Sequence, residues 1–191
     1  MNKKRSTRDK ILDTIFTLVY IHGYNGTSMS MVLKECGIPK GSLYHCFDSK
    51  KEMILAVLKE RISLKVDDLY DFKRVDNEHE IDTIVSNILK ISQKDMFIMN
   101  GCPLNKLNQE ISCIDKDFEF EINLVFEKIK NKIKLLLDNT TFNKNINTDS
   151  LSEYIITTIQ GSLSLSKNQS SKHRYLQSIS HLVSYLKSLK R

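Results

Sequence analysis

Apolar residues recur at helical spacing along most of the chain, which predicts helices and no sheet. The first pattern covers residues 8–22, where positions separated by one, three or four residues are apolar. These positions are Ile11, Leu12, Ile15, Leu18 and Val19. Gly23 follows, and we expect it to end this helix because glycine adopts positive φ angles without steric cost.

Two short helices are expected next. Thr27 or Ser28 can cap a helix that runs to Cys36, because a short hydroxyl side chain accepts from backbone N–H groups in the first turn. Gly37 stops that helix. A third helix should then cover about residues 39–47, with the proline in its first turn.

Longer helices fill the rest of the chain. Ser49 and Glu52 form a Ser-x-x-Glu capping box, which predicts a helix through about Leu69, and a polar connection follows at 71–80. A second such box, Ser150 to Glu153, opens a later helix. The expected later helices are 80–97, 104–113, 116–138, 150–166 and 171–189. No segment alternates with a period of two, so the predicted class is all-α, with about nine helices.

The charge is concentrated near the start of the chain. The formal net charge is +6, and residues 1–60 hold ten Lys or Arg against six acids, a net +4. Residues 1–7 are polar and basic and are expected to form a flexible arm. This balance permits a polyanionic partner.

Several classes of protein are excluded by what the sequence lacks. No apolar run approaches the roughly 18–20 residues that cross a bilayer, and no signal-peptide core is present, so a cytoplasmic protein without a membrane partner is expected. Cys36, Cys46, Cys102 and Cys113 form no CxxC pair and are expected as thiols. Cys36, Cys46 and His45 fit no common metal spacing. We therefore expect neither a metal nor a cofactor.

The second and third helices, joined by Gly37 and Ile38, have the dimensions of a helix-turn-helix. Leu43 and Phe47 are four residues apart and should face inward. The outward side chains would be Lys40, Ser42, Tyr44 and His45, which can donate to phosphates and base edges. Gly41 has no side chain to obstruct the approach of DNA.

Phosphate can also be held next to this motif. Thr27 and Ser28 open a helix N-terminus, where backbone N–H groups favour an anion. Lys50, at the start of the fourth helix, can reach another phosphate.

The segments ILDTIFTLVYIHGYNGTS, CGIPKGSLYHCFDSKKEM and AVL resemble the N-terminal domain of the TetR family of bacterial repressors. The core of the match runs from Gly37 to Phe47 and continues with Ser49 and Lys50. The resemblance implies that residues 39–45, Pro39 included, lie in the major groove and that Tyr44 and Lys50 contact phosphates. It also implies a DNA-binding domain at 8–70, with its connecting helix, and an effector-binding and dimerisation domain at 71–191.

A homodimer on a palindromic operator is expected, because a two-fold DNA site requires a two-fold protein. Small residues in 159–166, Gly161 among them, permit close approach of helices. The last helix adds an apolar stripe: Ile179, Leu182, Val183 and Leu186. The alternative is that this stripe packs inside a single chain.

The segment Gly101 to Glu110, GCPLNKLNQE, is similar to a stretch in a TetR subgroup that controls detoxification or efflux genes. Some members of that subgroup sense electrophiles through the cysteine. Cys102 is thus a candidate sensor, with Lys106 or Lys167 as a cation that stabilises its thiolate. The alternatives are a buried structural cysteine and an unknown small-molecule inducer bound nearby.

Two other functions are the alternatives to a DNA-binding regulator that senses a ligand. A helical thiol enzyme would use Cys102 as nucleophile, but no phosphate loop or catalytic motif accompanies it, and neither His173 nor His181 can be placed beside it. A ligand-free architectural DNA-binding protein would differ by having a fully packed second half. We therefore expect a non-enzymatic, ligand- or redox-responsive transcriptional regulator.

Overall fold

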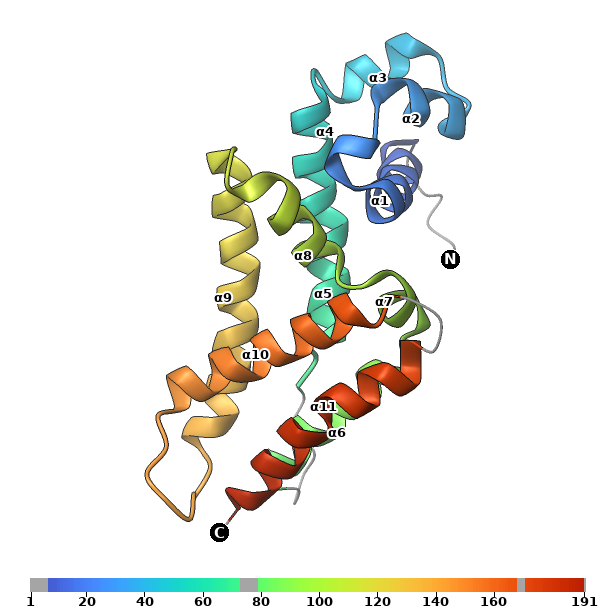
Figure 1. Ribbon diagram of the computed structural model, residues 1–191. Helices are drawn as coiled ribbons and strands as arrows, with labels where there is room; N and C mark the ends of the chain where they lie inside the picture. The colour runs from blue at the N-terminus through green and yellow to red at the C-terminus, as the bar shows by residue number, and fades with distance from the viewer. Residues whose placement is uncertain (1–6, 73–78, 168–170, 191) are drawn as a thin grey trace, which may run out of the picture. The chain divides into compact units, whose positions relative to one another are not determined.

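The computed structural model describes residues 7–72, 79–167 and 171–190, and the named elements in that part of the chain are all helical (Figure 1). The all-α prediction is confirmed. In the described residues the extended backbone pairs only at an isolated antiparallel bridge between Phe142 and Lys190. The expected arm 1–7 lies outside the described residues except for Thr7, which begins the first helix. Most of the expected connection 71–80 also lies outside them.

The chain divides into two compact units. The first contains the described residues up to Val66 together with Pro103–Asn123, and the second contains Asp67–Cys102 with Leu124 onward. This division differs from the expected boundary near residue 70, because the segment 103–123 packs with the N-terminal helices. The order of the sequence alone could not indicate that this later segment packs with the N-terminal helices.

The first unit begins with α1 (Thr7–Gly26), which is kinked at Gly23, where φ is 77°. The short helices α2 (Met29–Cys36) and α3 (Lys40–Cys46) follow. Then comes α4 (Lys50–Val57). The side chains that fill the core of this unit come from all four helices and include Leu12, Ile15, Val32, Leu43, Met53 and Ile54.

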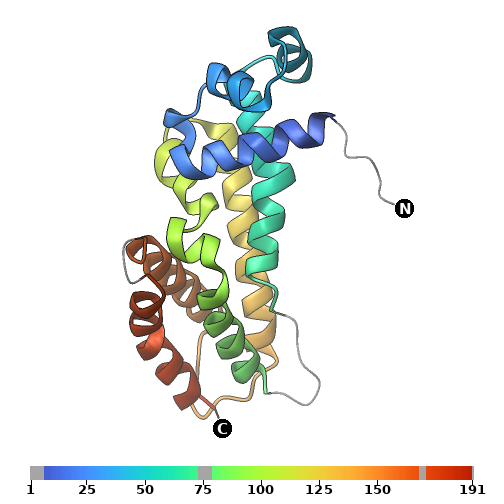
Figure 2. The ribbon, with the colours of Figure 1, turned by 90° about the vertical axis from the view of Figure 1, so that its right-hand side faces the viewer.

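Three further helical segments and the first part of a fourth belong to this unit. The π-helical turn η1 (Leu58–Ile62) joins α4 to α5 (Ser63–Leu69), so the fourth helix ends at Leu69 as predicted. From the later segment come α8 (Pro103–Leu107) and the π-helical turn η3 (Asn108–Ser112). These two pack against α1, beside which they lie in Figure 2.

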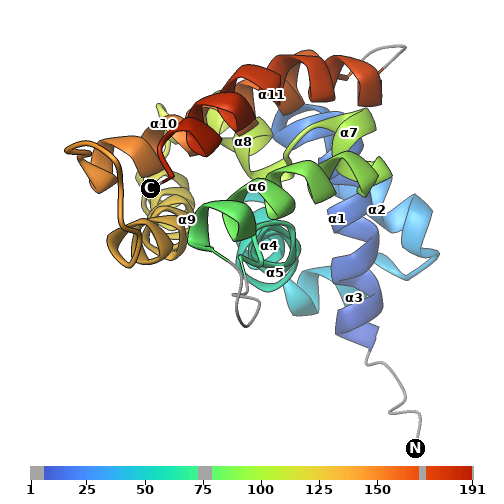
Figure 3. The same ribbon diagram turned by 90° about the horizontal axis from the view of Figure 1, so that it is seen from below.

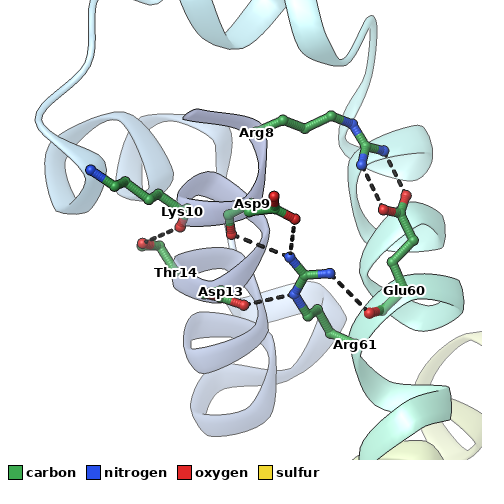
Figure 4. A network of polar contacts seen from close by, with 7 residues as sticks. All are labelled: Arg8, Asp9, Lys10, Asp13, Thr14, Glu60 and Arg61. Atoms are coloured by element: carbon green, nitrogen blue, oxygen red, sulfur yellow. Dashed lines mark hydrogen bonds and ion pairs between the residues drawn. The ribbon is translucent and has the colours of Figure 1, made fainter. Parts of the chain in front are cut away.

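Ion pairs join α1 to η1, as Figure 4 shows. Both terminal nitrogens of Arg8 donate to the carboxylate of Glu60 at 2.6 Å. Arg61 donates through Nε to Asp13 at 2.6 Å and through Nη2 to Asp9 at 2.8 Å. A π-turn inserts an extra residue into a helix, and η1 contains Glu60 and Arg61, the two residues that form these ion pairs with α1.

The second unit contains α6 (Glu80–Lys90), a 3-10 turn η2 (Ile91–Gln93) and α7 (Asp95–Asn100). The single helix expected over 80–97 is therefore wrong. The helix breaks at Lys94, whose backbone leaves the helical region with φ −93° and ψ 78°. The apolar spacing continues across this break, which explains why the pattern concealed it.

The long helix α9 (Lys116–Asp138) has the predicted bounds. The next helix, α10 (Thr148–Leu165), begins earlier than the expected box at Ser150. Asn147 caps it instead, since its side chain accepts from the Ser150 N–H at 2.9 Å. The serine hydroxyl donates back to the Asn147 carbonyl at 3.2 Å and so does not cap the helix.

The last helix, α11 (Ser171–Ser188), packs along α6 and α10 within the second unit (Figure 3). Its expected apolar stripe lies in this intrachain core, because Ile179, Leu182 and Leu186 are at most 1% exposed. Val183 is half-buried. The stripe therefore does not form a surface for a second chain, and the alternative stated above is the observed one.

Candidate nucleic-acid interface

The turn between α2 and α3 is fixed by local backbone geometry. At the start of α2, the Ser28 hydroxyl accepts from the Met31 N–H at 3.2 Å. At its end, Gly37 is left-handed, with φ 62° and ψ 30°, and its N–H bonds to the Leu33 carbonyl. Pro39 then takes an extended conformation as the N-cap of α3. These features turn the chain within three residues, as a helix-turn-helix requires.

One side of α3 anchors the helix and the other faces solvent. Leu43 is fully buried and Phe47, just after the helix, is 2% exposed. The exposed residues of the segment are Pro39, Lys40, Gly41, Ser42, Tyr44 and His45. The structure thus brings together six of the nine residues expected at a DNA interface on one outward surface.

Gly41 is notable because the fold does not require a glycine there. Nothing lies within 4 Å of the position that a Cβ would occupy, and the residue is helical and exposed. Glycine is less favourable than alanine in a helix, by up to about 0.5–1 kcal/mol in a helix interior. A close external partner, such as a nucleic-acid backbone, gives this glycine a use that packing within the chain does not.

Two lysines at this surface keep their charge uncompensated. Among the described residues neither Lys40 nor Lys50 forms an ion pair. Instead the Lys40 ammonium lies 5.5 Å from the Tyr44 ring centroid, and that of Lys50 lies 4.5 Å from the Tyr24 ring centroid. A cation over an aromatic ring is held in place while it retains its full charge.

Neighbouring lysines are neutralised by carboxylates. Lys51 contacts Asp115 and Asp117, each at 2.7 Å, and hydrogen bonds to these two groups raise the pKa of Lys51 to about 12. Lys59 pairs with Glu121 at 2.7 Å. Lys40 and Lys50 therefore differ from Lys51 and Lys59, whose charges are compensated by carboxylates of the same unit.

Thr27 differs from the expectation. It is fully buried, its hydroxyl donates to the Gly23 carbonyl at 2.8 Å, and its N–H bonds to the Tyr24 carbonyl at 3.4 Å. Its polar groups are therefore used inside the chain and are not offered to solvent. Ser28 remains at the helix N-terminus, with its hydroxyl engaged in capping.

The candidate sensor residues do not belong to this group of exposed residues. Cys102 is 3% exposed, in the second unit. Its neighbourhood includes Tyr70, whose pKa is raised well above the usual value by burial, with smaller contributions from Cys102 and Tyr175. Gln160 donates to the Tyr70 hydroxyl at 2.8 Å, and its own Oε1 is buried without a partner in the described part of the chain.

The two cations proposed to act on Cys102 are placed differently. Lys106 belongs to the first unit, where its ammonium donates to the carbonyls of Tyr20 and Ile21. Lys167 is exposed, and its aliphatic stem covers Gly101, where a Cβ would collide with it. Sequence reasoning missed Gln160 and also Glu110, although Glu110 ends the GCPLNKLNQE segment, four residues after Lys106.

The described residues hold no group of three His, Cys, Asp or Glu side chains arranged to bind a metal ion. No described helix combines the length and the apolar character that a membrane span needs.

Comparison with known proteins agrees with this geometry. Residues 11–57 match the family model described as bacterial regulatory proteins, tetR family. A Lactococcus lactis subsp. lactis protein, described as an uncharacterized HTH-type transcriptional regulator in the lacX 3' region, is 34% identical over 173 residues. That alignment covers 85% of this chain and 84% of the relative.

A shorter match and a structural match complete the comparison. The Staphylococcus aureus (strain Newman) regulator IcaR, a negative transcriptional regulator of the biofilm operon icaADBC, is 33% identical over 79 residues, 34% of this chain and 42% of that protein. A TetR transcriptional regulator from Chloroflexus aurantiacus J-10-FL superposes with a TM-score of 0.80 at 23% identity. The superposition covers 96% of this chain and 95% of the other chain, which establishes the shared fold.

Proposed function

This chain belongs to the TetR family of bacterial transcriptional regulators, and we propose that it is a homodimeric repressor that reads a palindromic operator through α3. The observation that carries the proposal is the outward face of α3, which is polar, contains an exposed glycine and is flanked by uncompensated lysines. The family is one of transcriptional regulators and not of enzymes, so the thiol-enzyme alternative is set aside.

Each exposed residue of this surface has a proposed role. Lys40, Ser42 and His45 would donate to base edges in the major groove, since they project from the anchored helix. Tyr44 and Lys50 would contact phosphates and so fix the register of the protein on DNA. Around them, Gly41 and Pro39 would allow close approach to the duplex, and the N-terminus of α2 at Ser28 would hold a further phosphate. Thr27 is left out of this set because its polar groups are used within the chain.

We propose that the dimer forms through the exposed faces of α10 and α11 in place of the buried stripe. On α10, Tyr154, Gly161 and Leu165 share one face and are exposed, the leucine by 60%. Tyr185 of α11 contacts Tyr154, with ring centroids 6.3 Å apart, so the two exposed faces adjoin there. A second copy of the chain is the occupant because a palindromic operator needs a two-fold partner.

We propose that an inducer acts on the second unit. In one version of this proposal, the inducer is an oxidant or an electrophile that oxidises or alkylates the Cys102 thiol. The thiol is buried beside Tyr70, so an added oxygen or alkyl group would have to disturb the packing there. The ordinary alternative is a small molecule that enters the same unit, where the buried Oε1 of Gln160 offers an acceptor. Control of detoxification or efflux genes is part of this proposal and rests on the GCPLNKLNQE segment.

The DNA that is bound to the protein when it is purified tests the proposed function. Sequencing that DNA should reveal one enriched site upstream of the regulated genes, and adding excess of this duplex should compete for binding at moderate salt. Co-purified fragments spread evenly over the genome would contradict a site-specific repressor and would favour an architectural protein.

A further inference from the structure

Two charged side chains of the segment after Cys102 contact the end of α1. Lys106 of α8 donates through Nζ to the carbonyls of Tyr20 and Ile21, at 3.1 and 2.7 Å. Glu110 of η3 accepts through Oε2 from the Asn25 N–H at 3.1 Å. Both segments belong to the first unit and lie side by side (Figure 2).

These contacts lie on either side of the kink in α1. In an uninterrupted α-helix the carbonyl of Ile21 would accept from the N–H of Asn25, four residues later. Gly23 lies between them with a φ of 77°, outside the helical region. In the structure each of these two backbone groups has a charged partner instead. The Ile21 carbonyl accepts from the Lys106 ammonium, and the Asn25 N–H donates to the Glu110 carboxylate.

Gly23 is fitted to this arrangement in two ways. Its positive φ is a conformation that L-amino acids with a side chain rarely adopt. A Cβ there would also collide with the carboxylate of Glu110. The kink and the carboxylate are therefore matched to each other, and neither is explained by the apolar core alone.

The kink determines where α2 begins. After it, Thr27 bonds back to the carbonyls of Gly23 and Tyr24, at 2.8 and 3.4 Å, and Ser28 caps α2. The short α2 leads within three residues into α3, so a change at Gly23 would shift the start of both helices.

We propose that Lys106 and Glu110 are positioning residues for DNA recognition, which hold the turn of α1 that sets the placement of α2 and α3. This inference rests on the proposed function, since it needs the outward face of α3 to bind DNA. It also makes operator affinity depend on α8, which the chain enters from the second unit between Cys102 and Pro103.

Glu110 gives a test in which electrostatics and positioning predict opposite signs. Removing a carboxylate from a DNA-binding unit reduces its repulsion of phosphates, so charge alone predicts tighter binding by Glu110→Ala. Positioning predicts binding of the operator that is weaker by about tenfold, the effect of one hydrogen bond to a charged group. Glu110→Gln keeps an acceptor for the Asn25 N–H and should lose less operator affinity than Glu110→Ala. Gln109→Ala changes an exposed neighbouring residue and should bind the operator as tightly as the wild type.

Lys106 gives an independent test with a charge-matched control. Lys106→Met keeps the stem and removes the donors, so operator binding should weaken by about tenfold, while Lys106→Arg should retain most of it. Lys116→Met removes the same charge from an exposed side chain of the same unit and should have little effect.

A purely structural role is separated from positioning by a second readout. For each variant, affinity is measured for the operator and for an unrelated duplex, well below the unfolding temperature. Positioning predicts that the ratio of the two affinities falls. The inference is overturned if folded Glu110→Ala and Lys106→Met keep the wild-type ratio, or if Glu110→Ala binds the operator more tightly. If wild-type protein shows no preference for any site, the proposed function fails instead.

Discussion

Single cations at the candidate interface differ in whether their charge is already used. Lys51 is held by two carboxylates at 2.7 Å, whereas its neighbour Lys50 lies over the ring of Tyr24 and forms no ion pair with any described residue. Only a cation of the second kind can neutralise a phosphate without first leaving another partner. The two adjacent lysines therefore form a matched pair for experiment.

Replacing each of these lysines by alanine should have different effects on DNA binding. Lys50→Ala should weaken binding to all duplexes and lower the slope of log affinity against log salt by about one unit. Lys51→Ala removes the same formal charge and should leave the slope unchanged. A fluorescence anisotropy titration at several salt concentrations measures both slopes, and equal slopes for the two variants would refute the proposed phosphate contact.

Gly41 provides a prediction in which stability and function move in opposite directions. A Cβ at this position meets no atom within 4 Å, so Gly41→Ala should raise the free energy of unfolding, by at most about 0.5–1 kcal/mol because Gly41 lies in the first turn of α3. The added methyl group should nevertheless weaken operator binding, because it separates α3 from DNA. A thermal melt and a binding titration check this, and unchanged affinity would show that the duplex does not approach α3 closely at Gly41.

Among the helical elements, the π-turn η1 is one that the sequence could not predict. The apolar spacing indicated a continuous helix to Leu69, and the helix does end there, but periodicity does not report one inserted residue. Arg61 contacts two carboxylates of α1 from this turn. The caps were easier to predict, because Ser28, Gly37 and Ser49 act through their immediate neighbours.

The Arg8–Glu60 pair gives this element a pH dependence. The hydrogen bond from Arg8 lowers the pKa of Glu60, so the pair stabilises the fold above the unfolded pKa, about 4.3, and this contribution is lost as pH falls through the folded pKa. Both side chains are more than a third exposed, so the contribution is at most about 1 kcal/mol. The gap in unfolding free energy between wild type and Glu60→Gln should shrink from neutral to acid pH, and a gap that grew would contradict the assignment.

At the scale of the whole molecule, the sequence predicted the class and the DNA-binding helices better than the assembly. The stripe on the last helix has the spacing of an interface, but a buried intrachain helix has the same spacing, and Leu182 and Leu186 pack inside the second unit. The sequence also did not predict that residues 103–123 belong to the first unit, for a related reason. This placement depends on contacts such as Lys106 to Tyr20, which join residues 86 apart.

The revised interface makes its own prediction. Leu165→Glu places a charge on the exposed face of α10 and should give folded monomers with weakened operator binding. Leu135→Glu alters a leucine that is 65% exposed on α9 and serves as a control that should stay dimeric. Leu186→Glu should instead unfold the chain, because that residue is fully buried. Sedimentation and circular dichroism distinguish these results, and a dimeric Leu165→Glu would place the interface elsewhere.

The central claim, that α3 reads a two-fold operator, is tested most directly by selecting binding sites from randomised duplexes with wild type and with His45→Ala. The wild type should select a palindrome whose half-sites are separated by about one helical turn or a multiple of it. His45→Ala should relax the preference at one base position, and at the symmetric position of the other half-site. A selected site without two-fold symmetry, or an unchanged preference at every position for the variant, would contradict the account.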